Sequence, residues 1–368
     1  MGDTAQHGLA DPLHGVSLFA LVGGVVLYLL GHVAFKLRAL RVINVPRAGV
    51  AVALLALLAA GAHLPALVLL AILTAAVVAL MVFETWHLGE ERVASGTPPT
   101  DRMSAMQLTG KTVLLTGATG GIGHAIGRRV HRAGATLILT GRRAEVLEPL
   151  AKELGARTLV VDLADPAALD SLLDDAGEVD IVVANAALPA SGLLSSFSTD
   201  GIDAAIDVNL RAPIVMARHY ADAFAAQGSG HLVFISSISG KVGTPHSSMY
   251  SATKFGLRGF AQALRVELAA ESVGVSVVFP GFVRGAGMFA DSGAVLPKGI
   301  GTSSPEQVAD AVVDAIERNR GEVDVAPLTI RASAMVAGLV PELAAKITKL
   351  VGGHKIGSDL AAGQAKHH

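Results

Sequence analysis

The chain has 368 residues, of which 51% are apolar and 16% charged, with no cysteine and a net charge of −2. The lack of cysteine excludes disulfides, zinc–thiolate sites and thiol nucleophiles, and the near-neutral charge predicts no nucleic-acid partner. The thirteen histidines are scattered without metal-ligand spacing, so we expect no metal site.

The first 87 residues hold most of the apolar excess. Residues 16–35 contain no charged residue and, as a helix about 30 Å long, would match the hydrocarbon thickness of a bilayer. A second apolar region is interrupted at Pro65, and we interpret it as two helices, about 48–62 and 65–86. A signal peptide is disfavoured because the first 15 residues lack Lys and Arg, and three nearly uncharged runs in a row disfavour the buried helices of a soluble protein. We therefore expect a bundle of about three transmembrane helices.

The basic residues predict the orientation of this bundle. Lys36, Arg38, Arg41 and Arg47 all lie between the first two apolar runs, whereas the N-terminal tail has no Lys or Arg. Because basic loops stay in the cytoplasm, we expect a multi-pass membrane protein with its N-terminus outside and its remaining chain in the cytoplasm. Trp86 would lie at the interface.

A polar segment rich in Gly, Ser and Pro, residues 88–107, reads as a linker to a second domain at residues 108–327. There, continuously apolar runs alternate with helical patterns that begin at Gly121 and Ala144. Such runs are typical of parallel strands covered on both faces, so we predict an α/β, Rossmann-like, doubly wound parallel sheet. The predicted strands are Thr112–Thr116, Thr136–Thr140, Thr158–Val161, Ile181–Ala184, Leu232–Ser236 and Val275–Phe279.

The segment TGATGGIG, residues 116–123, joins the first predicted strand to the first predicted helix. Glycine there lets the backbone turn tightly and approach a pyrophosphate, with the helix N-terminus facing the negative charge. The loop therefore indicates a dinucleotide site.

From about Leu108 to Ala326, the chain resembles the short-chain dehydrogenase/reductase family. The resemblance rests on TGATGGIG, Asp162 after the third strand, ANAA at 184–187, Asn209 in DVNL, ISS before YSATK, and Pro280-Gly281. It implies an NAD(P)-dependent enzyme that interconverts an alcohol and a carbonyl. The expected catalytic residues are Asn209, Ser237, Tyr250 and Lys254. The expected cofactor-binding residues are Gly117, Thr119, Gly121, Ile122, Gly123, Arg142, Arg143, Asp162, Leu163, Asn185, Ala186, Tyr250, Lys254, Pro280, Gly281 and Val283.

The residues themselves explain this chemistry. Tyr250 and Lys254 are four residues apart, so they share one face of a helix, and a nearby ammonium lowers the pKa of a phenol. Tyr250 can then act as general acid or base while Ser237 holds the substrate oxygen. By the resemblance, Asn209 would hold a water that links Lys254 to solvent.

Two departures from the family pattern weaken parts of the site. Ala184 and Ala187 replace the first Asn and the Gly of the usual NNAG, and Gly285 stands where the family often has a Thr that contacts the cofactor. Arg142 and Arg143 follow the second strand where NAD enzymes carry an acid, so we expect NADP(H) to be preferred over NAD(H). The alternative is that both arginines are solvated charges at a helix start.

Beyond the predicted core, residues 328–368 form a C-terminal extension, either an amphipathic surface helix or a segment packed on the core or a second subunit. We expect a homo-oligomer formed through the dehydrogenase domain. The membrane tether and the apolar residues Met288, Phe289, Val295 and Leu296 of the lid region predict a lipophilic substrate. The alternative function is a membrane-bound nucleotide sensor or scaffold without turnover, although a sensor needs no proton donor.

Overall fold

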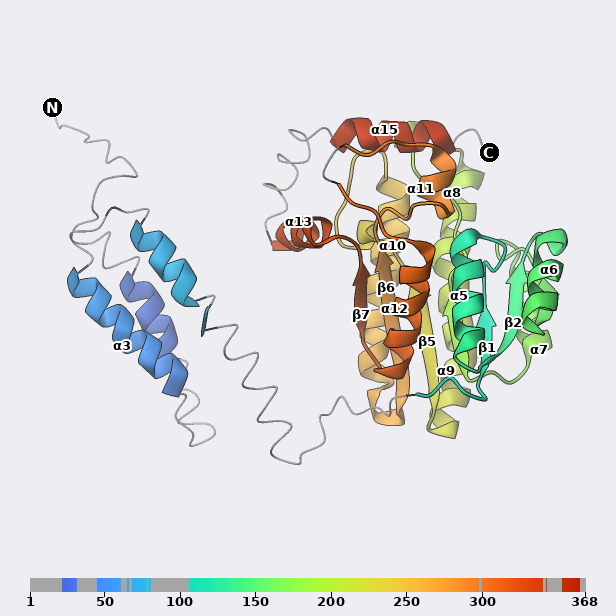
Figure 1. Ribbon diagram of the computed structural model, residues 1–368, viewed down its shortest axis with the longest axis horizontal. Helices are drawn as coiled ribbons and strands as arrows, with labels where there is room; N and C mark the ends of the chain where they lie inside the picture. The colour runs from blue at the N-terminus through green and yellow to red at the C-terminus, as the bar shows by residue number, and fades with distance from the viewer. Residues whose placement is uncertain are drawn as a thin grey trace. The chain divides into compact units, whose positions relative to one another are not determined.

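The computed structural model describes residues 22–31, 45–60, 65, 68–77, 79–80, 106–297, 300–339, 342 and 353–364 (Figure 1). The chain divides into two compact units, Met1–Thr100 and Asp101–His368. Predictions about the remaining residues, including most of the linker 88–107, the basic loop and Trp86, lie outside the described part.

In the N-terminal unit, three helical segments pack along one apolar face each: residues 22–31, α3 (Val45–Ala60) and residues 68–77. Val26, Leu54 and Leu73 belong to the small buried cluster between them. The outward positions are apolar too, because Leu27, Tyr28, Val52, Leu55 and Leu70 are large, apolar and exposed.

The predicted membrane-spanning helices are not found as such. None of the helices in the described ranges is both long enough and apolar enough to cross a membrane. The α3 helix has 16 residues, or about 24 Å at the usual rise, which is shorter than the hydrocarbon core of about 30 Å. It also begins three residues before the predicted start at residue 48.

The second unit contains a seven-stranded, fully parallel sheet in the order β3-β2-β1-β4-β5-β6-β7 (Figure 1). The strands are β1 (Thr112–Leu115), β2 (Thr136–Gly141), β3 (Arg157–Val160), β4 (Ile181–Ala184), β5 (Gly230–Ile235), β6 (Val273–Pro280) and β7 (Glu322–Val325). Every residue of β4, β5 and β6 is buried, which is why these runs are apolar without alternation. The predicted Rossmann-like sheet is confirmed.

Two layers of helices cover the sheet. One face packs against α5 (Gly121–Arg132), α6 (Ala144–Leu154) and α12 (Pro305–Glu317). The other face packs against α7 (Pro166–Ala176), α9 (Ala212–Gln227) and α10 (Ser248–Glu267). Among the described residues, the further α-helices of this unit are α8 (Thr199–Ile206), α11 (Gly287–Ser292), α13 (Leu328–Leu339) and α15 (Gly353–Gln364).

The strand order locates the functional end of the sheet. The chain runs outward from β1 to β3, then returns to β4 on the other side of β1. The connections after β1 and β4 therefore separate, and in open α/β sheets this separation leaves a crevice beyond the carboxyl ends of the strands. The glycine loop and the segment Asn185–Leu188 both begin there.

The six predicted strands are present, with ends within two residues of those expected, and α5 and α6 begin at Gly121 and Ala144 as predicted. The seventh strand was not predicted. Its sequence EVDV is short and places two acids on a strand at the edge of the sheet, and only Val323 and Val325 are buried. Cations from other elements neutralise these acids, which local sequence does not reveal.

Candidate active site

The glycine loop is held against the end of β4. Gly117 has φ +66°, and a Cβ on it would lie 2.7 Å from the Cα of Ala186, so only glycine fits. The hydroxyl of Thr116 accepts the N–H groups of Asn185 and Ala186, both at 3.1 Å. The Asn185 amide donates to the carbonyls of Thr116 at 3.0 Å and Gly117 at 3.1 Å. Asn185 therefore braces the loop, and Thr116 shares this role although the sequence did not single it out.

The same loop brings backbone close to the start of α5. A Cβ on Gly123 would overlap the Gly117 carbonyl oxygen, and a Cβ on Gly121 would overlap the side chain of Ala286. No side chain caps the N-terminus of α5, and its first turn holds no acid. An uncapped helix start beside a glycine cradle suits a pyrophosphate.

The end of β2 carries the two arginines. Gly141 leaves room for Thr119, since a Cβ there would lie 2.6 Å from the Thr119 methyl. Arg143 donates through Nη2 to the Thr119 carbonyl at 2.8 Å, which ties it to the glycine loop. Arg142 is more loosely held, with Nη1 3.8 Å from the Asp162 carboxylate and 60% of its side chain exposed.

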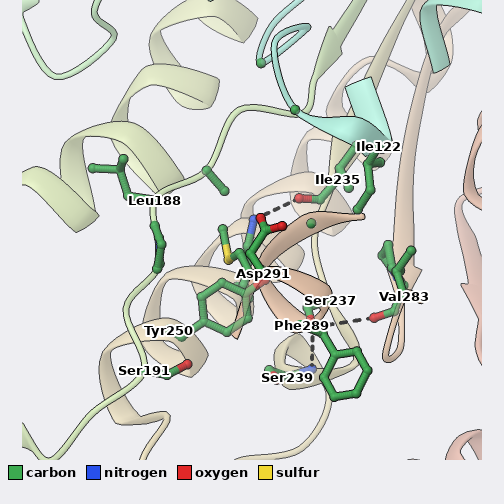
Figure 2. Close-up of a pocket in the computed structure, with 18 of the residues that line it drawn as sticks. Ile122, Leu188, Ser191, Ile235, Ser237, Ser239, Tyr250, Val283, Phe289 and Asp291 are labelled. Carbon is green, nitrogen blue, oxygen red and sulfur yellow. Dashed lines mark hydrogen bonds between the residues drawn. The ribbon is translucent and has the colours of Figure 1, made fainter. Parts of the chain in front are cut away.

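Ser237 and Tyr250 lie close together at the cavity, where the turn after β5 packs against α10 (Figure 2). Ser237 follows β5, and its hydroxyl accepts the N–H of Ser239 at 3.1 Å. Tyr250 lies on α10, where the nearby Ser237 side chain lowers the pKa of its hydroxyl, although burial dominates. Lys254 is one turn further along, with Nζ 5.7 Å from the centre of the tyrosine ring. The predicted grouping of these three residues is present.

Burial sets the proton affinities of this group. It raises the pKa of Tyr250 to about 12, against a smaller opposing effect of the Ser237 side chain. It lowers the pKa of Lys254 to about 8. The shift of Tyr250 is opposite to the lowering expected from an adjacent ammonium, because Lys254 Nζ donates to the Ile235 carbonyl at 2.9 Å rather than to the phenol, and desolvation dominates.

Asn209 supports the site from behind. It lies in a π-helical turn, Asp207–Arg211, and is buried. Its amide donates to the Leu188 carbonyl at 3.0 Å, and its Oδ1 accepts the Leu188 N–H at 2.6 Å. Asn209 thus fixes the segment after β4, and the water-holding role that the resemblance implies stays a prediction.

The end of β6 completes the cofactor side. Gly281 donates its N–H to the Val325 carbonyl at 2.9 Å, and Val283 forms a bridge with Ser303. Gly285 has φ +75°, a conformation in which a side chain such as Thr is strained. The departure from the family pattern at Gly285 therefore has a backbone cause.

A single cavity of about 1160 Å³ joins these parts. Every predicted catalytic and cofactor-binding residue lines it except Asn209. The cavity wall also includes residues that the sequence did not indicate, and Figure 2 shows several around Tyr250. They are Thr140, Leu188, Ser191 and Ile300, with Thr329, Ile330 and Ser333 of α13 and Ile356, Gly357, Leu360 and Gln364 of α15.

This cavity fits a dinucleotide on three observations. The glycines leave space that side chains would fill, and the start of α5 is uncapped. The third observation is Thr140, a residue of the cavity wall whose buried hydroxyl has no hydrogen-bond partner among the described residues. A buried hydroxyl without a partner is uncommon and suits a ligand that supplies one.

Comparison with known proteins identifies the family. The sequence model described as short chain dehydrogenase matches residues 111–295, about half of the chain, and spans the glycine loop, Ser237, Tyr250 and Lys254. The chain is a short-chain dehydrogenase. Relatives with curated sequences support the assignment of this short-chain dehydrogenase to the oxidoreductases that depend on NAD(P).

Two relatives and one solved structure show the extent of the similarity. The ketoacyl reductase HetN of Nostoc sp. is 36% identical over 227 residues, which is 59% of this short-chain dehydrogenase and 79% of HetN. The 3-oxoacyl-[acyl-carrier-protein] reductase FabG of Rickettsia conorii is 36% identical over 49% of this chain and 75% of its own. A short-chain dehydrogenase from Sphingobium yanoikuyae, solved in complex with NADPH, is 28% identical with a TM-score of 0.56, over 63% of this chain and 95% of its own.

Proposed function

We propose that this short-chain dehydrogenase is a membrane-held, NADPH-dependent reductase of a lipophilic ketone or aldehyde, or the corresponding alcohol dehydrogenase in reverse. One observation carries the proposal. Ser237, Tyr250 and Lys254 line the same large cavity as the glycine loop. A dinucleotide against the loop would extend toward the catalytic tyrosine, with the remaining space open to a substrate.

The chain's own residues account for the proton transfer. A nicotinamide cofactor, when bound, would supply the hydride for the carbonyl carbon. Tyr250, protonated at neutral pH because burial raises its pKa to about 12, donates its hydroxyl proton to the carbonyl oxygen. Ser237 donates a hydrogen bond to that oxygen, and the Lys254 ammonium stabilises the phenolate that remains. Solvent then returns the proton to Tyr250.

The preference for NADPH rests on Arg142. Its guanidinium is mostly exposed at the cavity wall, and its nearest carboxylate, on Asp162, is 3.8 Å away. A ribose 2′-phosphate would offer it a stronger, bidentate partner. The NADPH-bound structure from S. yanoikuyae supports the same cofactor.

The proposal that the substrate is lipophilic depends on the apolar residues that line part of the cavity. Leu188, Phe289, Ile300, Ile330 and Leu360 line it from five different segments, and the ring of Phe289 packs against Phe282 at 5.1 Å. The relatives from Nostoc and Rickettsia are named for reducing ketoacyl compounds, which join a carbonyl to an acyl chain. An apolar chamber of this size suits such a chain.

Membrane attachment rests on the N-terminal unit. Its helices expose Leu27, Tyr28, Val52 and Leu70 on the side away from their shared cluster, a surface that water disfavours. With the basic loop between residues 35 and 48 on the cytoplasmic side, the N-terminus would lie outside and the dehydrogenase unit in the cytoplasm. Exposed Phe255 and Val266 on α10 support the proposed homo-oligomer, which light scattering would test.

The test of the proposed reaction is NADPH oxidation by the full-length protein with a panel of ketones and aldehydes. Tyr250→Phe should bind NADPH as the wild type does and lose about 10²-fold or more in turnover, because it lacks the proton donor. NADPH binding by both proteins without turnover of any carbonyl would favour the nucleotide sensor. Equal turnover by both proteins would show that another group is the acid.

A further inference from the structure

The helix α15 lies across the end of the dehydrogenase unit beside α11 (Figure 1). It begins at Gly353, well after the last strand, yet Ile356, Leu360 and Gln364 line the same cavity as Tyr250. These three residues are spaced four apart, so they form one stripe along the helix. Asp359 and Ala362, on other faces, are exposed.

Glycines seat α15 closely on its neighbours. A Cβ on Gly357 would overlap the Pro245 carbonyl oxygen, and a Cβ on Gly363 would overlap the backbone of Ser292 in α11. Glycine in a helix lowers the stability of that helix. Its presence at both contacts indicates that close packing of α15 on its neighbours matters more here than the stability of the isolated helix. Pro245 belongs to the loop before α10, and Ser292 to the segment after β6.

A hydrogen bond joins α15 to the loop at Ala190 and Ser191, whose backbone in turn contacts the backbone of Tyr250. Gln364 is 4% exposed, and its Oε1 accepts the N–H of Ser191 at 3.2 Å. The preceding residue, Ala190, accepts the N–H of Tyr250 at 3.2 Å. One short loop therefore links Gln364 to the backbone of Tyr250.

We propose that α15 is the wall that sets which substrates the chamber accepts, with Ile356 and Leu360 as specificity-determining residues and Gln364 holding the wall closed. The inference rests on the proposed function, because it assigns the substrate end of that site. Leu360 limits the length of the chain attached to the carbonyl, and the seated helix keeps water from the space beside Tyr250.

The first experiment tests the seating and needs no turnover. Hydrogen–deuterium exchange of the segment around Ser191 is measured in the full-length wild type, Gly357→Ala and Gly338→Ala. The two substitutions are matched, because both add a methyl to a helix, but the methyl at Gly338 of α13 meets open space. Gly357→Ala should speed exchange around Ser191 and Gly338→Ala should not. Equal exchange in all three proteins would overturn the seating of α15.

The second experiment tests specificity with 2-pentanone and 2-undecanone as probes. Leu360→Ala should raise the ratio of kcat/KM for the longer over the shorter ketone by about tenfold or more, and Leu360→Trp should lower it. Ala362→Val, on the exposed face, is the control and should leave the ratio unchanged. Unchanged ratios in both Leu360 variants would overturn the inference.

Binding separates this inference from the proposed function. The same two ketones are titrated calorimetrically into each protein in the presence of saturating NADP. If the wild type turns over neither of these ketones nor any carbonyl of the panel, but the ratio of binding constants shifts in Leu360→Ala, α15 is the wall of a binding chamber and the proposed reductase is wrong. If turnover occurs and neither ratio shifts, the reductase stands and the role of α15 is overturned.

Discussion

Burial has opposite effects on the two titrating residues of the active site. It keeps Tyr250 protonated, with a pKa of about 12, and weakens the hold of Lys254 on its proton, with a pKa of about 8. The tyrosine is thus available as an acid throughout the physiological range. The lysine is the group whose charge changes near neutral pH.

The first prediction follows from this difference. Lys254 is charged below about pH 8 and loses its proton above it, and only the ammonium stabilises the phenolate formed when Tyr250 gives up its proton. We expect kcat/KM for carbonyl reduction, measured from pH 6 to 10, to fall with an apparent pKa near 8. Lys254→Arg stays charged over this range, so any activity it retains should lack that decline. A wild-type profile that is flat to pH 10 would contradict the assignment.

The second prediction separates the two arginines. Arg142→Ala should raise the KM for NADPH about tenfold or more and leave that for NADH nearly unchanged, because it removes the partner of the 2′-phosphate. Arg143→Ala should weaken both cofactors alike, since Arg143 holds the glycine loop at Thr119. Steady-state kinetics with both cofactors checks each variant, and an equal loss in Arg142→Ala would show that NADPH is not selected there.

Single residues were predictable where a motif carried them. Gly117, Ser237, Tyr250 and Lys254 belong to such patterns, and all line the cavity. Gln364 and Ser191 belong to no pattern, because their proximity depends on two segments far apart in sequence packing together. The predicted lowering of the Tyr250 pKa is wrong for a similar reason. The burial that raises this pKa is a property of the folded core.

Among the elements, β7 connects the edge of the sheet to the catalytic segments. Glu322 accepts two hydrogen bonds from Arg258 of α10, at 2.7 and 3.2 Å, and pairs with Lys241 at 2.9 Å. Lys241 follows the turn that begins at Ser237, and Arg258 is one turn beyond Lys254. This edge strand therefore anchors both elements that carry the catalytic residues.

The third prediction concerns this anchor. Burial alone would raise the pKa of Glu322, but the hydrogen bonds from Arg258 and Lys241 outweigh it and lower the pKa overall. We expect Glu322→Gln to lower the free energy of unfolding at pH 7 by about 1–3 kcal/mol, measured in urea. Because the lowered pKa means that the contribution is lost as pH falls below about 4.5, the difference from the wild type should narrow in acid.

A matched control is Glu153→Gln. Glu153 pairs with Arg128 at 2.7 Å, yet both side chains are nearly half exposed, so the change should hardly alter unfolding. If Glu153→Gln lowered the free energy of unfolding as much as Glu322→Gln, burial would not explain the contribution of the Glu322 ion pairs.

The apolar strands β4, β5 and β6 were predictable because all their residues are buried, whereas β7 was not. Its acids make it resemble a loop until Lys241 and Arg258 are placed beside it. For a related reason, the sequence after Leu328 is compatible with either an amphipathic surface helix or a segment packed on the core or a second subunit. Its hydrophobicity is compatible with a surface or a core, and only the fold brings α15 onto α11.

At the scale of the whole molecule, two units of different character share one chain. The N-terminal unit has apolar residues on both the inner and outer faces of its helices, and the second unit encloses a cavity within a covered sheet. The composition predicts a linker at residues 88–107 between two domains, and the structure divides the chain after Thr100. Apolar composition did not reveal that the described helices of the first unit are shorter than a membrane span.

The fourth prediction tests the proposed orientation. In intact cells, a tag at Met1 should be accessible to an antibody without permeabilisation, and a tag placed after Gln364 should need it, because the basic loop holds the intervening chain inside. Fluorescence of the two tagged proteins, with a cytoplasmic marker as control, checks this. Accessibility of the first tag only after permeabilisation would reject the orientation.

The distance in sequence between Tyr250 and α15 has a consequence for biosynthesis. A ribosome releases the glycine loop and the catalytic tyrosine long before Leu360 and Gln364. Until those residues emerge, the nascent enzyme has its acid and its nucleotide cradle but one open side to its substrate chamber. Competence for selective turnover would thus arise late in translation, and a stalled or clipped chain would be an unselective enzyme rather than an inert one.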